Sequence, residues 1–125
     1  MDYTDDDLTQ SIIQCIIRVH RELGPGFLES IYRNALLLEL RKHRVSTEAE
    51  AEVVVQYQGQ EVGRHRLDLL VEGRVMVELK TVEELSPAHY AQLRSYLKAT
   101  GLPVGLLVNF AKERADFRRL ENGSP

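Results

Sequence analysis

The sequence predicts one α/β domain with the element order α-α-β-β-β-α-β, and three observations lead to this prediction. The chain has 125 residues, which is the length of one ordinary domain. Apolar residues recur with helical spacing as far as Lys42, and the period changes to two between Val45 and Lys80. A capped helix and a short apolar run then complete the pattern, so we expect a sheet flanked by helices.

The first helix is expected to begin after Thr4 and to end at the sequence Gly24-Pro25-Gly26. Thr4 is a suitable N-cap, and the three aspartates that follow it suit the positive end of the helix dipole. The apolar positions at helical spacing are Leu8, Ile12, Ile16, Val19 and Leu23.

A second helix is expected from about Leu28 to Lys42. Its apolar residues fall on two neighbouring stripes, so we expect burial on more than one side. One stripe consists of Leu28, Ile31, Ala35 and Leu38, and the stripe beside it consists of Tyr32, Leu36 and Leu40.

Turn residues and a change of period mark the remaining elements. Three strands are expected, the first ending near Tyr57, the second over about Glu61 to Val71 and the third over Arg74 to Lys80. Ser86 and Pro87 are typical of a helix cap and first helical residue, and they predict a helix to about Thr100 that ends at Gly101. The last expected segments are a buried strand over Val104–Val108, a candidate edge strand over Ala115–Leu120 and a frayed tail over 121–125.

Composition limits the function classes. The chain has 16 Lys plus Arg against 19 Asp plus Glu, a net charge of −3, which argues against a protein that coats DNA by charge alone. It does not exclude a nuclease, because a metal site needs carboxylates. The single cysteine, Cys15, excludes an internal disulfide and a thiolate zinc cluster, and its isoleucine neighbours predict a buried packing residue.

The sequence also bears on location. The acidic start, residues 1–7, lacks the apolar core of a signal peptide. No apolar run reaches the ~20 residues that span a bilayer. We therefore expect a cytoplasmic protein with no membrane partner.

The hairpin of the second and third predicted strands carries the strongest register prediction. Burying Leu69 and Val77 on one face requires odd residues to pair with odd residues. A three-residue loop at 71–73, with Gly73 in the left-handed conformation, satisfies this requirement. It would pair Leu70 with Arg74 and Asp68 with Met76; the odd residues expected in the core are Leu67, Leu69, Val71, Val75, Val77 and Leu79.

This register gives the opposite face a chemical character. Asp68, Glu78 and Lys80 would project from it, with the two acids as diagonal neighbours roughly 7–8 Å apart between backbones. Two carboxylates so close repel each other unless a cation lies between them, and an oxygen-only pair suits Mg²⁺ or Mn²⁺ better than zinc. The alternative is a solvated strand face that carries ordinary charges.

Two other segments carry polar residues at suggestive spacing. His89, Gln92 and Tyr96 share one face of the expected third helix, and a solvent-exposed face is the alternative. Glu29 lies in the first turn of the second helix, where it either takes part in a site or only complements the helix dipole.

Taken together, these segments resemble the PD-(D/E)xK nuclease superfamily, and more narrowly its GxxExxY family, whose motif is present as Gly26, Glu29 and Tyr32. The resemblance covers nearly the whole chain. It implies a restriction-endonuclease-like αβββαβ core with a mixed central sheet flanked by helices and an extra N-terminal helix. The segments that carry it are Val19–Tyr32, Arg66–Val71, Val77–Lys80, Gln92–Tyr96 and Gly105–Phe110.

The resemblance also implies residue roles. Asp68, Glu78 and the main-chain carbonyl of Leu79 match the metal ligands, and Lys80 matches the lysine that positions the attacking water. The remaining matches are Glu29, a helix-borne acid that would hold an outer-shell water of the ion or complete a second ion site; Gln92 and Tyr96, which hold substrate and site; and His89 and Tyr32 as accessory residues. One departure is that Leu67 stands where the signature has proline.

The implied function is hydrolysis of phosphodiester bonds in nucleic acid, with DNA favoured, by water activated on Mg²⁺ or Mn²⁺. Because few insertions exist to grip a duplex, we expect a homodimer or a larger nucleic-acid-processing partner. One alternative is a non-catalytic module of the same fold that binds nucleic acid or a protein. Another is an enzyme subunit that cuts only with its partner.

Overall fold

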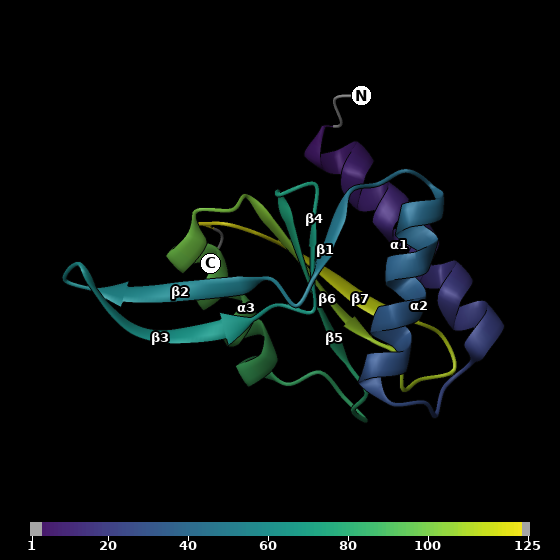
Figure 1. The fold of residues 1–125 in the computed structure, drawn as a ribbon. Coiled ribbons are helices and arrows are strands. Elements are labelled where there is room, and N and C mark those ends of the chain that lie inside the picture. Colours follow the sequence, from purple (N-terminus) through teal and green to yellow (C-terminus); the bar gives the residue numbers. More distant parts are fainter. Residues whose placement is uncertain (1–3, 124–125) are drawn as a thin grey trace.

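The computed structural model describes residues 4–123 and shows a five-stranded mixed sheet between helices, as predicted. The helices are α1 (Asp5–Leu23), α2 (Glu29–Lys42) and α3 (Pro87–Thr100), and the strands are β1 (Thr47–Ala49), β2 (Glu52–Tyr57), β3 (Gln60–Arg66), β4 (Leu69–Val71), β5 (Val75–Lys80), β6 (Val104–Asn109) and β7 (Asp116–Glu121). The sheet has the order β1-β4-β5-β6-β7, in which only β5 and β6 are parallel neighbours. Helices α1 and α2 cover one face and α3 covers the other (Figure 1).

The helix boundaries follow the predicted signals. The Thr4 side chain accepts a hydrogen bond from the Asp7 N–H at 3.0 Å, and the helix ends at Gly24 with φ of 69°. Helix α3 begins after Ser86 with Pro87 in its first turn, and it ends at the left-handed Gly101. These caps confirm the predicted ends of both helices.

Of the two stripes predicted on α2, one is fully buried and the other is not. Tyr32, Leu36 and Leu40 are fully buried, whereas Leu28 and Leu38 are 71% and 63% exposed. A single helix face packs on the sheet, because α1 lies beside α2 rather than above it (Figure 1). The second stripe is therefore the core face.

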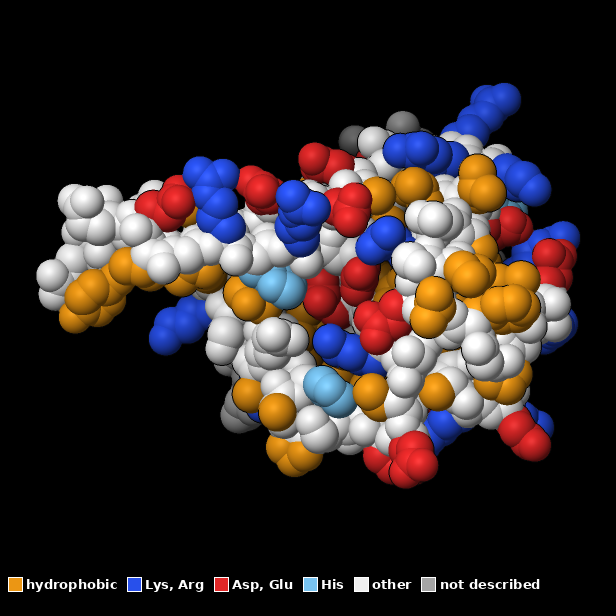
Figure 2. Space-filling model, turned by 60° about the horizontal axis from the view of Figure 1, so that its bottom comes forward, with side chains coloured by type: hydrophobic (Ala, Val, Ile, Leu, Met, Phe, Trp, Pro, Cys, Tyr) orange, Lys and Arg blue, Asp and Glu red, His pale blue; other side chains and the backbone are white. Residues whose placement is uncertain are grey.

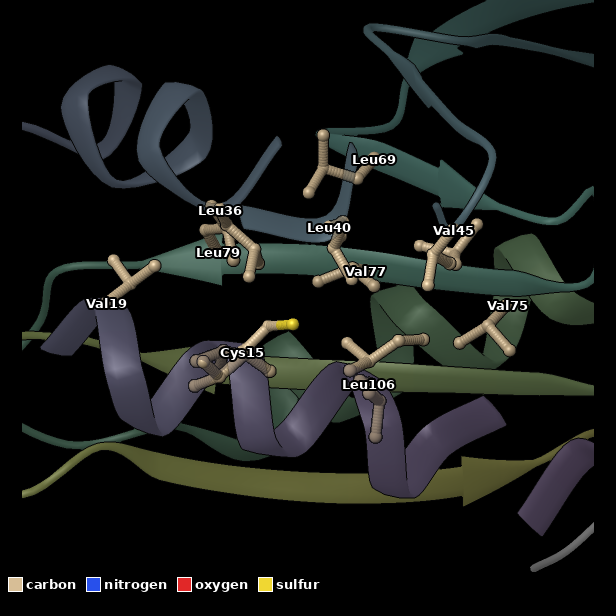
Figure 3. Close-up of a cluster of buried hydrophobic side chains, with 14 of the residues drawn as sticks. Cys15, Val19, Leu36, Leu40, Val45, Leu69, Val75, Val77, Leu79 and Leu106 are labelled. Atoms are coloured by element: carbon tan, nitrogen blue, oxygen red, sulfur yellow. The ribbon is translucent and has the colours of Figure 1, made fainter. Parts of the chain in front are cut away.

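The larger core lies between this helical layer and the sheet (Figure 3). The odd-numbered residues of β5 point into it, which confirms the predicted face. Cys15 packs among them, and burial raises the pKa of its thiol to about 11, so it is a packing residue as expected. The sheet residues of this core include Leu69, Val71, Val75, Val77, Leu79 and Leu106.

Strands β1 to β4 form one long antiparallel ribbon. Thr47 lies opposite Val71 in the β1–β4 half, and Glu52 lies opposite Arg66 in the β2–β3 half, which is a single continuous register. The first half is part of the sheet. The second half, residues 52–66, projects away from the body, and we call it the arm (Figure 1).

The ribbon bends at Glu50 and Asp68. Glu50 has a left-handed φ of 55°, and its N–H donates to the Asp68 carbonyl at 3.0 Å. The two long predicted strands are therefore each divided in two. Leu67, expected beside Leu69 in the main core, packs instead in the smaller cluster against α3, because the bend turns it over.

The β4–β5 turn differs from the prediction by two residues of register. Leu70 pairs with Met76 rather than with Arg74, so the loop comprises residues 72–74 instead of 71–73. Odd residues still pair with odd residues, as predicted.

Glu72 explains this shift, because it adopts a left-handed φ of 53° that non-glycine residues rarely take. Its N–H donates to the Ser46 carbonyl at 2.7 Å, and its carboxylate accepts from the Ser46 N–H at 2.8 Å. These two bonds offset the strain, and Gly73 follows in the predicted left-handed conformation with φ of 64°.

The C-terminal segment is more regular than expected. The predicted edge strand is present as β7, and it extends through Glu121. The Asn122 side chain then donates to the carbonyls of Leu97 and Leu102, both at 2.9 Å. The predicted fraying is therefore wrong for 121–122, and residues 124–125 lie outside the described range.

Candidate metal and active site

The candidate site lies where the arm leaves the sheet. The β4–β5 ladder ends at the Leu69–Val77 pair, so the next residues of β5 are free to bond side chains. The Leu79 N–H donates to Asp68 Oδ2 at 2.8 Å, and the Asp68 N–H donates to Glu78 Oε1 at 3.0 Å. These two bonds hold Asp68 and Glu78 side by side at the point where β4 and β5 separate. We call this point the fork.

The change of register alters how the two acids face each other. Counting one residue further along each strand from the Leu69–Val77 pair, where the ladder ends, brings Asp68 across from Glu78 rather than onto a diagonal. Glu78 shares its face of β5 with Met76, which packs in the cluster against α3, and Lys80 follows on that face by strand alternation. In Figure 2, acidic side chains gather between the arm and the helical side, with a histidine and cations beside them.

Burial makes these carboxylates unusual. Glu78 is 6% exposed, and its burial, followed by the charge of Asp68, raises its pKa to about 7. Burial also raises the pKa of Asp68, against the bond from the Leu79 N–H and the charge of Arg33. Two desolvated acids at one point repel each other, and a cation between them would relieve that repulsion.

Lys80 and Glu29 both act electrostatically on this pair. Lys80 is half-buried, and its charge lowers the pKa of each acid. Glu29, in the first turn of α2, adds to the raised pKa of Glu78. The structure therefore brings both predicted residues within electrostatic reach of Asp68 and Glu78.

Arg33 also belongs to the site, although the sequence interpretation missed it. Its guanidinium lies 3.9 Å from Asp68 Oδ1 and 3.6 Å from Glu50 Oε1. Its position four residues after Glu29 was an available signal, because residues at this spacing share a helix face.

His65 is a second group that the sequence interpretation missed. Its Nε2 lies 3.5 Å from Glu78 Oε2, and its ring stacks on Tyr96 with centroids 4.0 Å apart. Burial lowers the pKa of His65 below its ordinary value, because it disfavours the charged imidazolium. The sequence pattern gave no sign of His65, because this residue lies on the arm and comes close to Glu78 through the bend of the ribbon.

The other predicted residues lie elsewhere or act structurally. Tyr32 is fully buried; its hydroxyl donates to the Gly24 carbonyl and accepts from the Phe27 N–H, which holds the loop before α2. The Ser86 N–H donates to His89 Nδ1 at 3.0 Å, at the start of α3. Gln92 is exposed on α3. Tyr96 stacks on His65, which in turn lies beside Glu78.

The site fits a divalent cation in its charge and its donor atoms. Asp68 and Glu78 supply oxygen, and the carbonyl of Leu79 points to the same side as its N–H, toward Asp68. Within residues 4–123, no three histidine, cysteine or acidic side chains close around one point. Carbonyl, water or substrate oxygens would therefore complete the coordination.

Comparisons with known proteins identify relatives of this fold. A sequence model described as the PD-(D/E)XK nuclease superfamily matches residues 6–120. No curated protein matches the chain in sequence. Among the described residues, none of the helices is long and apolar enough to cross a membrane.

Solved structures of two proteins share the fold. The crystal structure of SSO0001 has a TM-score of 0.61 at 21% identity; the match covers 78% of this chain but only 52% of SSO0001, so the chain spans about half of that protein's length. The alkaline exonuclease LHK-Exo from Laribacter hongkongensis has a TM-score of 0.52 at 12% identity, over 98% of this chain and 72% of the exonuclease. A complex of LHK-Exo with dAMP has a TM-score of 0.50 at 12% identity, over 91% and 82%. These likenesses confirm the restriction-endonuclease-like fold.

Proposed function

Because this chain belongs to the PD-(D/E)XK nuclease superfamily, we propose that it hydrolyses phosphodiester bonds in nucleic acid at the fork between β4 and β5. The observation that carries the proposal is the hydrogen bond from the Asp68 N–H to Glu78 Oε1, which holds together two residues whose side-chain carboxyl groups each have a raised pKa. A protein gains no stability from such a pair, so a functional role accounts for it best.

We assign the cation to Asp68, Glu78 and the carbonyl of Leu79. A bound Mg²⁺ or Mn²⁺ lowers the pKa of a water and neutralises charge that develops on phosphate oxygens. The protein contributes a rigid fork, because backbone N–H groups already orient both carboxylates. Glu29 is expected to reach the ion through water.

The neighbouring cations have separate roles in this proposal. Lys80 follows Glu78 on the same face, where its ammonium can orient the attacking water and offset the new negative charge. Arg33 lies 3.9 Å from Asp68 Oδ1, and its planar guanidinium suits a phosphate oxygen. Gln92, exposed on α3, remains a predicted substrate contact.

A metal-dependent cleavage screen tests this function. Single-stranded, double-stranded and nicked DNA and RNA are incubated with the protein and Mg²⁺ or Mn²⁺. We expect cleavage by the unchanged protein and none by Asp68→Ala or Glu78→Ala, because a misplaced ion loses several contributions at once. The matched control is Glu48→Gln, which removes an exposed acid of the same sheet and should cut normally.

The outcomes separate the alternatives. Appreciable metal-dependent cutting by Asp68→Ala would contradict the assignment. Binding of nucleic acid without cleavage by the unchanged protein would favour a non-catalytic module. Cleavage that appears only with an added partner would favour a subunit.

Finer features of the proposal rest on the resemblance. We assign the chain to the GxxExxY family on Gly26, Glu29 and Tyr32. We favour DNA as the substrate, and we expect a homodimer or a larger nucleic-acid-processing partner and a cytoplasmic location. The substrate screen tests the preference for DNA, and sedimentation of the purified protein tests for the homodimer.

A further inference from the structure

The inner face of the arm, which packs on α3 at its base, is a surface that the proposed roles leave unexplained. Val53 is 5% exposed in the cluster against α3, and His65, its partner across the arm, stacks on Tyr96. Farther out, Val55 is half-buried and Tyr57 is 65% exposed. Val53, Val55 and Tyr57 share one side of β2, because the extra residue of the bulge lies in β3. The inner face therefore continues beyond the cover that α3 provides.

The charged residues of the arm lie on its outer face. Arg64 donates to Glu52 Oε2 at 2.9 Å and to Glu61 Oε1 at 3.0 Å. Arg66 lies opposite Glu52 in the strand register. These four are the acids and cations of residues 52–66, so the inner face has none. Figure 2 shows the same division, with acids and cations along one edge of the arm and hydrophobic side chains along the other.

The exposed part of the inner face is too small for a stable protein interface. Its apolar side chains beyond α3 are those of Val55 and Tyr57. An aromatic side chain buries at most about 250 Å², whereas each partner of a stable interface buries about 800 Å². Gly63, opposite Val55, adds no side chain, and a β-carbon there would meet nothing within 4 Å. The surface is therefore narrow and flat, which suits a planar ligand.

The inner face begins at the proposed active site. His65, at the base of the arm, lies 3.5 Å from Glu78 Oε2. Tyr57 lies four residues beyond Val53, the partner of His65, which is roughly 14 Å along a strand. That distance corresponds to a few nucleotides of a nucleic-acid strand. A strand whose phosphodiester lies at the fork can therefore reach Tyr57 with a neighbouring base.

The chemistry of the inner face selects bases rather than phosphates. Duplex binding depends on cations that face the phosphates, whereas an aromatic surface binds the flat side of a base, which is free in an unpaired strand. We propose that the inner face of the arm binds unpaired bases of a single-stranded nucleic acid that enters the fork, with Tyr57 as the stacking residue. The inference rests on the proposed function, because the fork supplies the site for the phosphodiester.

A tryptophan reporter tests this contact, because the chain has no tryptophan of its own. Tyr57→Trp keeps an aromatic ring at an exposed position. Val54→Trp is the matched control on the outer face, where Val54 lies opposite Arg64 and is 37% exposed. Both proteins also carry Glu78→Gln and are held in EDTA, so that the strand is not cut. The probes are a short oligodeoxythymidylate, a short oligouridylate and a blunt DNA duplex.

We expect a single strand to quench the emission of Tyr57→Trp, because a stacked base quenches indole fluorescence. The emission of Val54→Trp should stay unchanged, and the duplex should quench neither reporter. Stronger quenching by the oligodeoxythymidylate identifies DNA as the source of the unpaired bases, and stronger quenching by the oligouridylate identifies RNA.

Fluorescence anisotropy of a labelled single strand measures the affinity in the same Glu78→Gln background. Tyr57→Ala should weaken binding at least about fivefold, Tyr57→Phe should retain it, and Val54→Ala is the matched control. The loss in Tyr57→Ala should be the same at low and high salt, because the contact releases no counterions from the phosphates. A loss that shrinks with salt would indicate a phosphate contact and overturn the stacking role.

The outcomes separate this inference from the proposed nuclease. Quenching of Tyr57→Trp that is confined to single strands supports the inference. No quenching, or equal quenching by the duplex, overturns it, and the nuclease stands if the unchanged protein cleaves nucleic acid with Mg²⁺ or Mn²⁺. Emission that changes with protein concentration alone overturns it in favour of a second copy on this face. Quenching without cleavage by the unchanged protein supports the binding face and overturns the hydrolytic reaction.

Discussion

At the residue scale, the buried carboxyl group of Glu78 lowers the stability of the folded chain when it ionises. Glu78 is almost fully buried and is bonded through one oxygen by the Asp68 N–H. Its pKa of about 7 lies well above the ordinary value of 4.5. The folded chain therefore holds this proton more tightly than the unfolded chain, and metal-free stability falls as pH rises from about 4.5 to 7.

Glu78→Gln should remove this loss of stability. Glutamine keeps the oxygen that accepts the Asp68 N–H but cannot ionise. In EDTA at pH 8, we expect the variant to have a larger free energy of unfolding, by about 2–3 kcal/mol at most. Near pH 4, where the carboxyl is protonated, the difference should vanish. Urea unfolding at both pH values measures it, with Glu48→Gln as control; equal stability at pH 8 would contradict the argument.

Tyr32 illustrates a motif residue with a structural contact. Its buried hydroxyl joins the Gly24 carbonyl to the Phe27 N–H, and its ring stacks on Phe110 with centroids 4.4 Å apart. The tyrosine thus fixes the loop from which α2 and Glu29 begin.

Tyr32→Phe keeps this ring and removes only the hydroxyl. We expect a loss of about 1–3 kcal/mol in the free energy of unfolding, because two buried backbone groups lose their partner. Mn²⁺ affinity should stay within experimental error if the hydroxyl is purely structural. Denaturation and calorimetry on one preparation check both, and lost affinity with unchanged stability would assign Tyr32 to the site instead.

At the element scale, the bend in the β1–β4 ribbon is the feature that creates the site. Because of the bend, the Leu79 N–H at the end of β5 can donate to the Asp68 carboxylate. The bend also brings His65, on the arm, next to the Glu78 carboxylate. Helix α3 must lie close to the sheet to complete the arrangement with Tyr96. That approach depends on Gly105 in β6, because a β-carbon there would lie 3.0 Å from the Leu93 side chain.

Gly105→Ala should therefore destabilise the α3 packing. Leu93 is buried and its three branch atoms face the glycine, so overpacking is expected to cost about 1–3 kcal/mol. Thermal unfolding measures the loss. Gly63→Ala is the matched control, because an added β-carbon there meets nothing within 4 Å. A Gly105→Ala protein as stable as that control would show that α3 can retreat freely.

At the scale of the whole molecule, the site joins elements from both layers. Glu29 and Arg33 come from α2, the two acids and Lys80 from the fork, and Tyr96 from α3. A cation that binds only this arrangement stabilises the entire fold by mass action.

Mn²⁺ should accordingly raise the melting temperature. At about 100 times its dissociation constant it adds about 2.7 kcal/mol, which corresponds to a shift on the order of 10 °C for a domain of this size. Asp68→Asn should abolish the shift, and Glu48→Gln should retain it. Differential scanning calorimetry measures all three proteins; an equal shift in Asp68→Asn would place the ion elsewhere.

Local signals in the sequence determined the order of elements, the helix ends at Thr4, Gly24 and Gly101, and the alternation that separates Glu78 from the core. These features depend on neighbours within a few residues, which a pattern records directly. The predicted hairpin register placed Asp68 on the same face as Glu78, and the family motifs assigned both acids to a metal ion.

Tertiary structure alone decided the rest. Whether β3 continues the sheet or bends away depends on the contact between Glu50 and Asp68, which are 18 positions apart. The closeness of His65 and Arg33 to the acids depends on that bend and on how α2 lies over it. No sequence period encodes such long-range geometry, because a strand that bends keeps the same alternation as one that runs straight.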